Sequence, residues 1–250
     1  MSIQIVDVAK AFGPKVVLDG CDLEIREGET MVVIGYSGAG KSVLLKTIVG
    51  LLQPDRGRAV VDGLVVQELT REALYELRRQ VGYVFQFAAL FDSMTISDNV
   101  AMGLRRMGTM SEGEIDERVD ESLRLVELEG YGPRMPAELS GGQRKRAGLA
   151  RAIATRPKYL LYDEPTTGLD PVTTAVIDAL ILKLKRELRV TSVVITHDMK
   201  SAYRVGDRIA MLYRGRIRQV GLPEEIRESA DPVVRGFVEG RLELAQEAAA

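Results

Sequence analysis

The chain is poor in cysteine, with Cys21 as the single one among 250 residues. One thiol cannot form an intramolecular disulfide, and a reducing compartment is therefore permitted. Long apolar runs are also missing: no stretch of about 18 residues could span a membrane. Met1–Asp7 lacks the basic stretch and apolar core of a secretory signal, so we expect no cleaved leader. If the protein works at a membrane, another chain must hold it there.

An excess of either charge is lacking as well. Lys and Arg number 34 against 36 Asp and Glu, a net charge of −2, which gives no general attraction to nucleic acid. Arg144, Lys145, Arg146 and Arg151 form a local basic cluster without interleaved aromatic residues for base stacking. We interpret this cluster as a solvated helix face that favours nearby phosphate, and we expect no nucleic-acid partner.

What the sequence does contain centres on GYSGAGKS, which fits the phosphate-binding pattern G-x-x-x-x-G-K-[ST]. Thr30–Ile34 before it predicts a strand and Val43–Val49 after it predicts a helix, the setting that this loop requires. Its glycines let successive N–H groups point at one anion, and the helix dipole adds to the attraction. We expect Lys41 to reach the β- and γ-phosphates and Ser42 to join the Mg²⁺ shell. The expected nucleotide contacts are Gly35, Tyr36, Ser37, Gly38, Ala39, Gly40, Lys41 and Ser42.

The rest of the chain alternates between strand-rich and helical segments. A helical block from about 87 to 156 interrupts strand-rich flanks and suggests a subdomain inserted in an α/β core. Near the N-terminus we expect two short strands, Val16–Leu18 and Leu23–Ile25, on either side of a turn at Asp19-Gly20. Further on, Thr173–Leu188 has the pattern of an amphipathic helix.

Polar side chains follow two of the predicted strands. Asp163 and Glu164 come directly after the apolar run Tyr159–Tyr162, at the strand end where open α/β sheets bind ligands. A carboxylate at Asp163 suits a hydrated Mg²⁺, and Glu164 can polarise an attacking water as a general base. His197, the one histidine, ends another predicted strand, and we expect it to hydrogen-bond the γ-phosphate.

A second candidate phosphate site lies in LSGGQ, residues 139–143. Its serine has the character of a helix N-cap, and the glycines after it present backbone N–H groups to an anion. The expected contacts are Ser140, Gly141, Gly142 and Gln143. One ATP needs only one such cradle, so we infer that the second serves the ATP of another subunit.

Together these motifs resemble the nucleotide-binding subunits of ABC transporters, in that family's order and over nearly the whole chain. GYSGAGKS is similar to Walker A, YLLYDE to Walker B, and LSGGQ to the signature sequence. Gln86 falls at the Q-loop position, Gly168-Leu169-Asp170 at the D-loop, and His197 at the switch histidine. The resemblance implies an α/β fold: an ABC-type P-loop ATPase with a RecA-like core, an antiparallel β subdomain and an inserted α-helical subdomain. Within one ABC ATPase domain, 1–250, the core would cover about 1–86 and 158–222, the helical subdomain 87–157, and a C-terminal helical extension 223–250.

The resemblance also implies individual roles. Two copies would sandwich two ATP molecules, each between Lys41 of one chain and Ser140 of the other. The catalytic residues would be Glu164, His197 and Lys41, and the Mg²⁺ contacts Ser42, Gln86 and Asp163. Phe12 falls near the family's adenine-stacking aromatic residue, with partial burial in the core as the alternative.

Four segments resemble, more narrowly, the ATPases of the bacterial Mla/Mce lipid-transport systems. They are GKSVLLK (40–46), FQFAALFD (85–92), RKR (144–146) and YDEP (162–165). This resemblance implies a phospholipid cargo, an integral inner-membrane permease, an MCE-domain lipid-binding subunit and, in some members, a small STAS-domain subunit. The ATPase would be a peripheral homodimer on the cytoplasmic face of the inner membrane.

Several readings stay open. An ABC transporter for another substrate would share every ATPase motif. A soluble ABC protein of DNA repair or translation ranks lower, because it would carry a coiled-coil insertion or two cassettes. The methionines between positions 94 and 110 either fill the core or, with Phe87, Phe91 and Ile96, line a groove for the permease. The segment Pro232–Glu243 either covers the core or contacts the partner ATPase.

Overall fold

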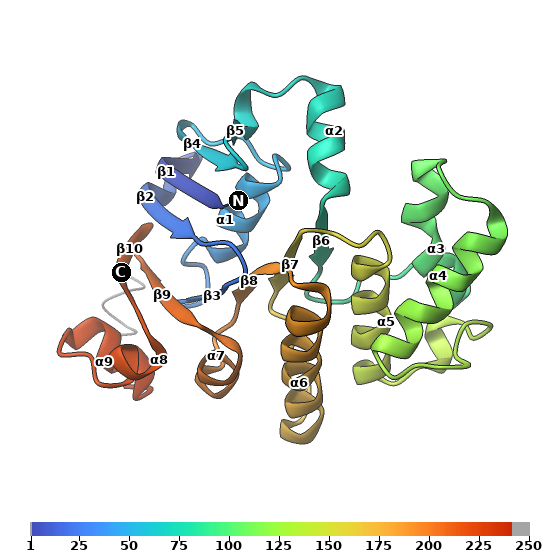
Figure 1. Cartoon of the computed structure of the whole chain (residues 1–250). Coiled ribbons are helices and arrows are strands. Elements are labelled where there is room, and N and C mark those ends of the chain that lie inside the picture. The colour runs from blue at the N-terminus through green and yellow to red at the C-terminus, as the bar shows by residue number, and fades with distance from the viewer. Residues whose placement is uncertain (1, 242–250) are drawn as a thin grey trace. The chain divides into compact units, whose positions relative to one another are not determined.

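The computed structural model describes residues 2–241 and divides the chain into two compact units (Figure 1). The first unit contains the chain up to Arg78 and again from Thr191, and the second is Arg79–Val190. Of the expected C-terminal extension 223–250, residues 242–250 lie outside the described part, as does the end of the segment Pro232–Glu243.

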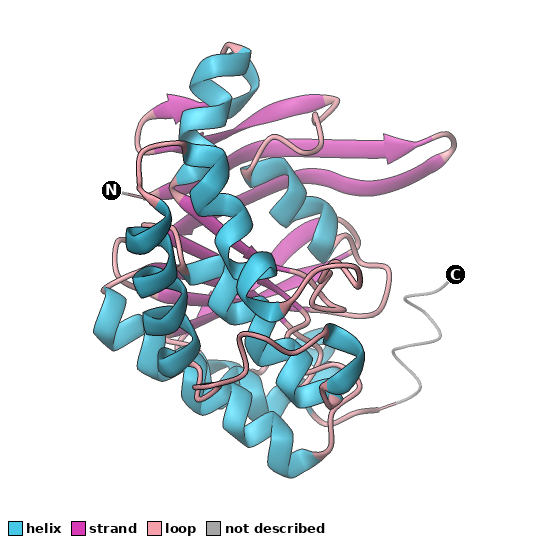
Figure 2. Cartoon of the chain, turned by 90° about the vertical axis from the view of Figure 1, so that its right-hand side faces the viewer, coloured by secondary structure: helices cyan, strands magenta, loops and turns pink. Residues whose placement is uncertain are grey.

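The first unit contains an antiparallel sheet and a mostly parallel group of strands (Figures 1 and 2). In the antiparallel sheet the order is β2 (Lys15–Ile25), β1 (Ile3–Phe12), β4 (Arg56–Val61) and β5 (Leu64–Val65). In the other group the order is β10 (Arg216–Gly221), β9 (Arg208–Tyr213), β3 (Thr30–Ile34) and β8 (Thr191–Ile195). Strand β3 runs parallel to both β8 and β9. Every residue of β3 and β8 is buried, as expected for parallel strands covered on both faces.

The helices of the first unit are mostly short. They are α1 (Lys41–Ile48), η1 (Val66–Glu68), α2 (Arg71–Arg79, which ends at the boundary), α7 (Met199–Val205), α8 (Pro223–Arg227) and α9 (Pro232–Val238). Asp231 is the N-cap of α9, and its side chain accepts hydrogen bonds from the N–H groups of Val233 and Val234 at 2.9 and 3.3 Å. Arg218 on β10 donates to the same carboxylate at 2.7 Å, which ties the start of α9 to the sheet.

The second unit is mainly helical. Its two strands, β6 (Val81–Val84) and β7 (Tyr159–Asp163), run parallel. Its helices are α3 (Ile96–Met107), α4 (Glu112–Leu125), η2 (Pro136–Glu138), α5 (Gly141–Ile153) and α6 (Pro171–Leu188). Helices α3, α4 and α5 pack on one another, and α5 also packs against β6 and α6.

Two sequence-based expectations about element boundaries are wrong. The turn predicted at Asp19-Gly20 is a bulge inside the continuous strand β2, because the register passes from Val8–Cys21 to Lys10–Leu18. Two residues there oppose one on β1, and Gly20 takes a left-handed φ of +71°. The helix predicted from Thr173 starts two residues earlier, because Asp170 caps it ahead of a proline at its first turn.

Cys21 lies on β2 and is completely buried. Together with Leu23 and Ile25 it alternates inward along the strand, while Asp22 and Glu24 are exposed. Burial raises the pKa of the Cys21 thiol to about 12, and the neighbouring Asp22 carboxylate adds to the shift. The thiol therefore stays protonated and acts as a small apolar side chain.

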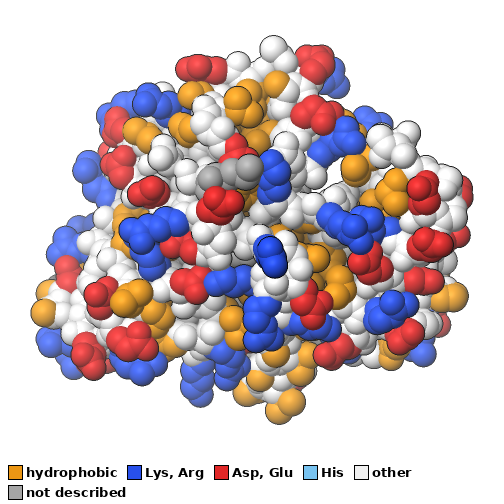
Figure 3. Space-filling model, in the orientation of Figure 1, with side chains coloured by type: hydrophobic (Ala, Val, Ile, Leu, Met, Phe, Trp, Pro, Cys, Tyr) orange, Lys and Arg blue, Asp and Glu red, His pale blue; other side chains and the backbone are white. Residues whose placement is uncertain are grey.

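Acidic and basic side chains are interspersed on the face seen in Figure 3, in keeping with their near-equal numbers. Within residues 2–241, no helix has the length and apolar character needed to cross a membrane.

Candidate functional site

The loop between β3 and α1 is shaped as a phosphate cradle. Gly40, the N-cap of α1, has a φ of +101°, and a Cβ there would lie 2.9 Å from Cγ1 of Val17. A Cβ on Gly35 would lie 2.4 Å from the carbonyl oxygen of Leu212. Both positions therefore require glycine. No acidic side chain occupies the first turn of α1, and no side chain caps it, so its N-terminal dipole favours an anion.

Lys41 already points into this loop. Its side chain is 7% exposed, and its Nζ donates to the carbonyl oxygens of Gly35 at 2.8 Å and Tyr36 at 3.1 Å. The ammonium group thus lies where the loop curls, at the first turn of α1, with Ser42 next in the helix. This donor arrangement fits a nucleoside triphosphate, since a cation and helix amides converge on one place.

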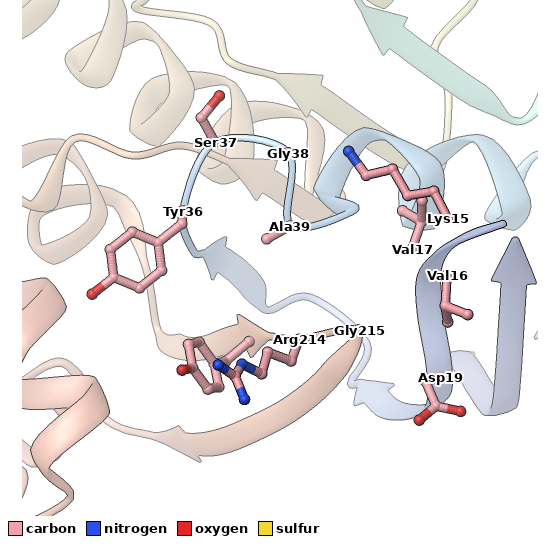
Figure 4. A pocket seen from close by; sticks show the side chains of 11 residues that line it. Lys15, Val16, Val17, Asp19, Tyr36, Ser37, Gly38, Ala39, Arg214 and Gly215 are labelled. Atoms are coloured by element: carbon pink, nitrogen blue, oxygen red, sulfur yellow. The ribbon is translucent and has the colours of Figure 1, made fainter. Parts of the chain in front are cut away.

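A cavity of about 780 Å³ adjoins the loop (Figure 4). Its lining comes from β2, from the loop residues Tyr36–Ala39 and from the turn between β9 and β10. This volume is in the range of small-molecule and cofactor sites. Lys15 lines the cavity and is the direct strand partner of Phe12, so Phe12 lies beside its rim. The Phe12 ring is 49% exposed and has the Lys10 ammonium 5.6 Å from its centroid.

His197 follows β8 in the same unit as the loop. Because β8 is parallel to β3, with Ile195 opposite Val33, the residues after both strands lie at one edge. His197 is exposed there, next to Asp198, which caps α7 by accepting two backbone N–H groups. The first unit therefore contains the expected loop residues, Phe12 and His197.

The second unit contains the predicted carboxylates and Gln86. Strands β6 and β7 are parallel, with Val84 opposite Tyr162, so Gln86, two residues after β6, and Asp163, the last residue of β7, lie at one edge. The Asp163 carboxylate is 8% exposed and accepts a hydrogen bond from the Tyr83 hydroxyl at 3.1 Å. Burial, followed by the Asp163 charge and this hydrogen bond, raises the pKa of Tyr83, so Tyr83 remains a donor.

Glu164 has an unusual backbone. Its φ is +52°, in the left-handed region that few non-glycine residues adopt. One carboxylate oxygen accepts the Thr167 hydroxyl at 2.9 Å, and its carbonyl oxygen accepts the Thr167 N–H at 3.3 Å. Strain of this kind concentrates at functional sites, and here the local turn holds the carboxylate in place.

The LSGGQ segment begins α5 as predicted. Ser140 accepts the Gln143 N–H at 3.3 Å, and the Gln143 side chain accepts the Ser140 N–H at 2.8 Å, a reciprocal capping box. Ser140 is exposed, so this end of the helix is accessible. Gly142 is required for packing, because a Cβ there would lie 2.5 Å from Cγ2 of Thr173 on α6.

Two residues of the second unit were not anticipated as parts of the site. Tyr83 lies on β6 opposite Leu161, two residues from Asp163 on the neighbouring strand, and the alternation of that strand could have indicated it. Lys145 is 7% exposed and donates to the carbonyl oxygens of Gln86 and Glu164. The expectation of a solvated basic face is therefore wrong for Lys145. The small and apolar residues Ala147, Gly148 and Leu149 that follow Lys145 are buried as well, and this run indicates that the helix packs closely there.

Magnesium, where it binds with ATP, needs oxygen ligands and retains several waters. The hydroxyl of Ser42, the amide oxygen of Gln86 and the carboxylate of Asp163 are chemically suited to it. Among the residues that the structure describes, no group of three acidic, histidine or cysteine side chains could hold a metal.

Known proteins resemble the chain over most of its length. The ABC transporter family profile matches residues 18–167. A probable ribonucleotide transport ATP-binding protein, mkl, from Mycobacterium leprae is 42% identical over 96% of this chain and 70% of its own. A sulfate/thiosulfate import ATP-binding protein, CysA, from a Synechocystis strain is 43% identical over 95% of this chain and 66% of its own.

A solved structure agrees with these matches. The ATP-binding cassette MJ0796, as a dimer in a post-hydrolysis state with ADP and phosphate, superposes with a TM-score of 0.81 at 35% identity. The match covers 88% of this chain and 98% of that one. The predicted α/β fold class, the ATPase activity and the use of ATP with Mg²⁺ are thereby confirmed. The chain belongs to the ABC transporter ATP-binding family.

Proposed function

We propose that the chain is the ATP-hydrolysing subunit of a bacterial ABC transporter for phospholipids or related lipids, of the Mla/Mce type. The observation that carries the ATPase part is the buried Lys41 ammonium, held inside a glycine-shaped loop at the start of α1. A helix N-terminus and a cation directed at one place bind a triphosphate. They also stabilise the negative charge on the phosphoryl group as it is transferred.

The reaction needs further groups beside Lys41, and we assign them as follows. Glu164 orients and deprotonates the attacking water, and His197 hydrogen-bonds the γ-phosphate. Ser42, Gln86 and Asp163 would hold Mg²⁺, which would neutralise phosphate charge. The hydrogen bond from Tyr83 keeps the Asp163 carboxylate oriented for this purpose.

A homodimer completes each site. The capped and exposed N-terminus of α5, at Ser140, presents Gly141 and Gly142 to the ATP that another copy holds at Lys41. ATP binding closes the dimer and hydrolysis reopens it, so the pair acts as a motor. The reported dimer of MJ0796 supports this arrangement.

The lipid cargo rests on the four segments that resemble Mla/Mce ATPases. Three of them contain the end of the phosphate loop, Gln86 or Asp163, and the fourth directly follows the signature. By this proposal the partners are an inner-membrane permease and an MCE-domain lipid-binding subunit, with a small STAS-domain subunit in some members of the group. The homodimer then lies on the cytoplasmic face of the inner membrane.

A transporter for another solute is the second candidate. The relative named for sulfate/thiosulfate import is 43% identical and the one named for ribonucleotide transport 42%, so identity over the ATPase does not discriminate. A soluble ABC protein that serves no transporter is the third and weakest reading.

The base assignment is tested by Glu164→Gln, which keeps the size and hydrogen bonding of the side chain. We expect ATP affinity within about twofold of wild type and turnover reduced about 10³-fold, the scale of losing a general base. Phosphate release and equilibrium binding of a fluorescent ATP analogue measure the two quantities. Wild-type turnover by this variant would remove Glu164 from the mechanism.

The cargo is tested by purifying the intact complex in detergent through this subunit. Recovery of an MCE-domain protein and co-extracted phospholipid is expected. Recovery of a periplasmic solute receptor instead would contradict the lipid assignment and favour the second candidate. Recovery without any membrane subunit would favour the third.

A further inference from the structure

One face of α5 contacts the segment that follows β6. Lys145, Gly148 and Arg151 are spaced at three-residue intervals on this helix, which places them on one side of it. All three contact residues 86–89. These residues lie in the second unit, between β6 and α3.

Arg151 and Gly148 fix the far end of this segment. Arg151 donates to the carbonyl oxygens of Ala88 and Ala89, each at 2.6 Å. Both alanines are left-handed, with φ of +60° and +51°, a conformation that alanine rarely adopts unless its surroundings impose it. A Cβ on Gly148 would lie 3.2 Å from Cβ of Ala88, so the helix and the segment are in close contact.

Lys145 fixes the near end and also reaches a second motif. Its ammonium donates to the carbonyl oxygen of Gln86 and, at 3.4 Å, to that of Glu164. Burial lowers the pKa of Lys145, and the Glu164 charge opposes that shift. Burying a cation costs free energy unless the cation is hydrogen-bonded. The hydrogen bonds to these two carbonyl oxygens offset that cost.

We propose that Lys145 is a positioning residue for hydrolysis: it holds the backbones of Gln86 and Glu164 at a fixed separation. The inference rests on the proposed roles of those two residues. Since Ser140 caps the same helix, a movement of α5 upon contact with a partner's ATP would displace Gln86 and Glu164 together. Among the described residues, Arg151 differs from Lys145 because the two carbonyl groups to which it donates, those of Ala88 and Ala89, both lie in the 86–89 segment.

The test compares Lys145→Met, which keeps the length and apolar stem, with Lys145→Arg and with Arg124→Met. Arg124 is an exposed cation on α4 of the same unit, 3.9 Å from Glu129, and serves as the matched charge-loss control. Full-length proteins are assayed for kcat, for ATP dissociation constant and for hydrogen exchange across residues 86–92.

Lys145→Met is expected to lower kcat about tenfold or more, the scale of one charge-assisted hydrogen bond, while ATP affinity changes less than about threefold. Hydrogen exchange across residues 86–92 is expected to be faster in Lys145→Met than in wild type. Lys145→Arg should retain more of the wild-type kcat than Lys145→Met, and Arg124→Met should match wild type in all three measurements. A kcat for Lys145→Met within about twofold of wild type would refute the proposal, as would an equal loss in Lys145→Arg. If circular dichroism shows that Lys145→Met does not fold, Lys145→Gln replaces it, with the same expectations and the same refuting results.

Failure of the positioning role and failure of the proposed function give different results. If Glu164→Gln is inactive and Lys145→Met is normal, only the positioning role is lost. If Glu164→Gln hydrolyses ATP normally, the base assignment that underlies the inference is lost first.

Discussion

The side chain of Phe237 on α9 packs directly on the phosphate loop. Its ring meets that of Tyr36 edge to face, with centroids 5.0 Å apart and planes at 86°, and the Tyr213 ring lies 6.3 Å from that of Tyr36 between centroids. The carbonyl oxygen of Tyr36 accepts a hydrogen bond from the Lys41 ammonium. A short chain of contacts therefore joins the C-terminal helix to the lysine that we expect to bind phosphate.

Replacing Phe237 by alanine should weaken ATP binding. An edge-to-face pair contributes about 0.5–1.5 kcal/mol, which, if it serves wholly to preorganise the loop, corresponds to about 2- to 13-fold in the dissociation constant. Because Phe237 is half-buried, the free energy of unfolding should fall by about 2 kcal/mol, roughly half the cost at a full core position.

The measurement is equilibrium binding of a fluorescent ATP analogue, with urea denaturation in parallel. Val233→Ala, which removes apolar volume from the same helix, is the control and should leave ATP affinity unchanged. A double-mutant cycle with Tyr36→Leu should give a coupling energy close to the affinity loss of Phe237→Ala. Equal affinity losses in Val233→Ala and Phe237→Ala, or a coupling near zero, would refute the argument.

Three further predictions concern other parts of the chain. Lys41→Ala should weaken ATP binding itself by about tenfold or more, measured by the same titration, and unchanged affinity would contradict the cradle. Ser111→Ala removes the hydroxyl that caps α4 and should lower the free energy of unfolding by about 1 kcal/mol without altering kcat. Hydrogen bonds from Thr95 and Arg105 hold the pKa of Asp98 below 3.8, so its stabilisation is complete above that pH and is lost as the pH falls through the lower, folded-state pKa. Asp98→Asn should therefore lose less of its free energy of unfolding between pH 6 and pH 3 than wild type does, as measured by urea denaturation. An equal loss in the two proteins would argue against this.

The sequence predicted those parts of the site that depend on local order. The loop after Thr30–Ile34 and the polar residues after Tyr159–Tyr162 are adjacent to strong apolar runs, and strand-end position alone indicates their chemistry. The Ser140 N-cap could be inferred for the same reason, because capping depends on neighbours three residues apart.

The contacts that sequence reasoning missed are long-range. Asp19-Gly20 has the composition of a turn, yet β2 pairs with β1 on both sides of it, and the two residues form a bulge within the strand. Lys145 stands between two arginines in the sequence, which indicates an exposed face, yet packing of α5 against the 86–89 segment buries it. The contact between Tyr36 and Phe237 joins residues from opposite ends of the chain, and no local pattern reports it.

The inward position of Cys21 makes the chain convenient for spectroscopic labelling. A thiolate is the reactive form of cysteine, and a completely buried thiol with a pKa of about 12 does not supply it near neutral pH. A cysteine introduced at an exposed position outside the proposed site, such as Glu117 on α4, would react selectively with a maleimide dye or spin label, with Cys21 left in place. Distances between two such labels, one on each copy, could then follow closure and reopening of the proposed dimer during turnover.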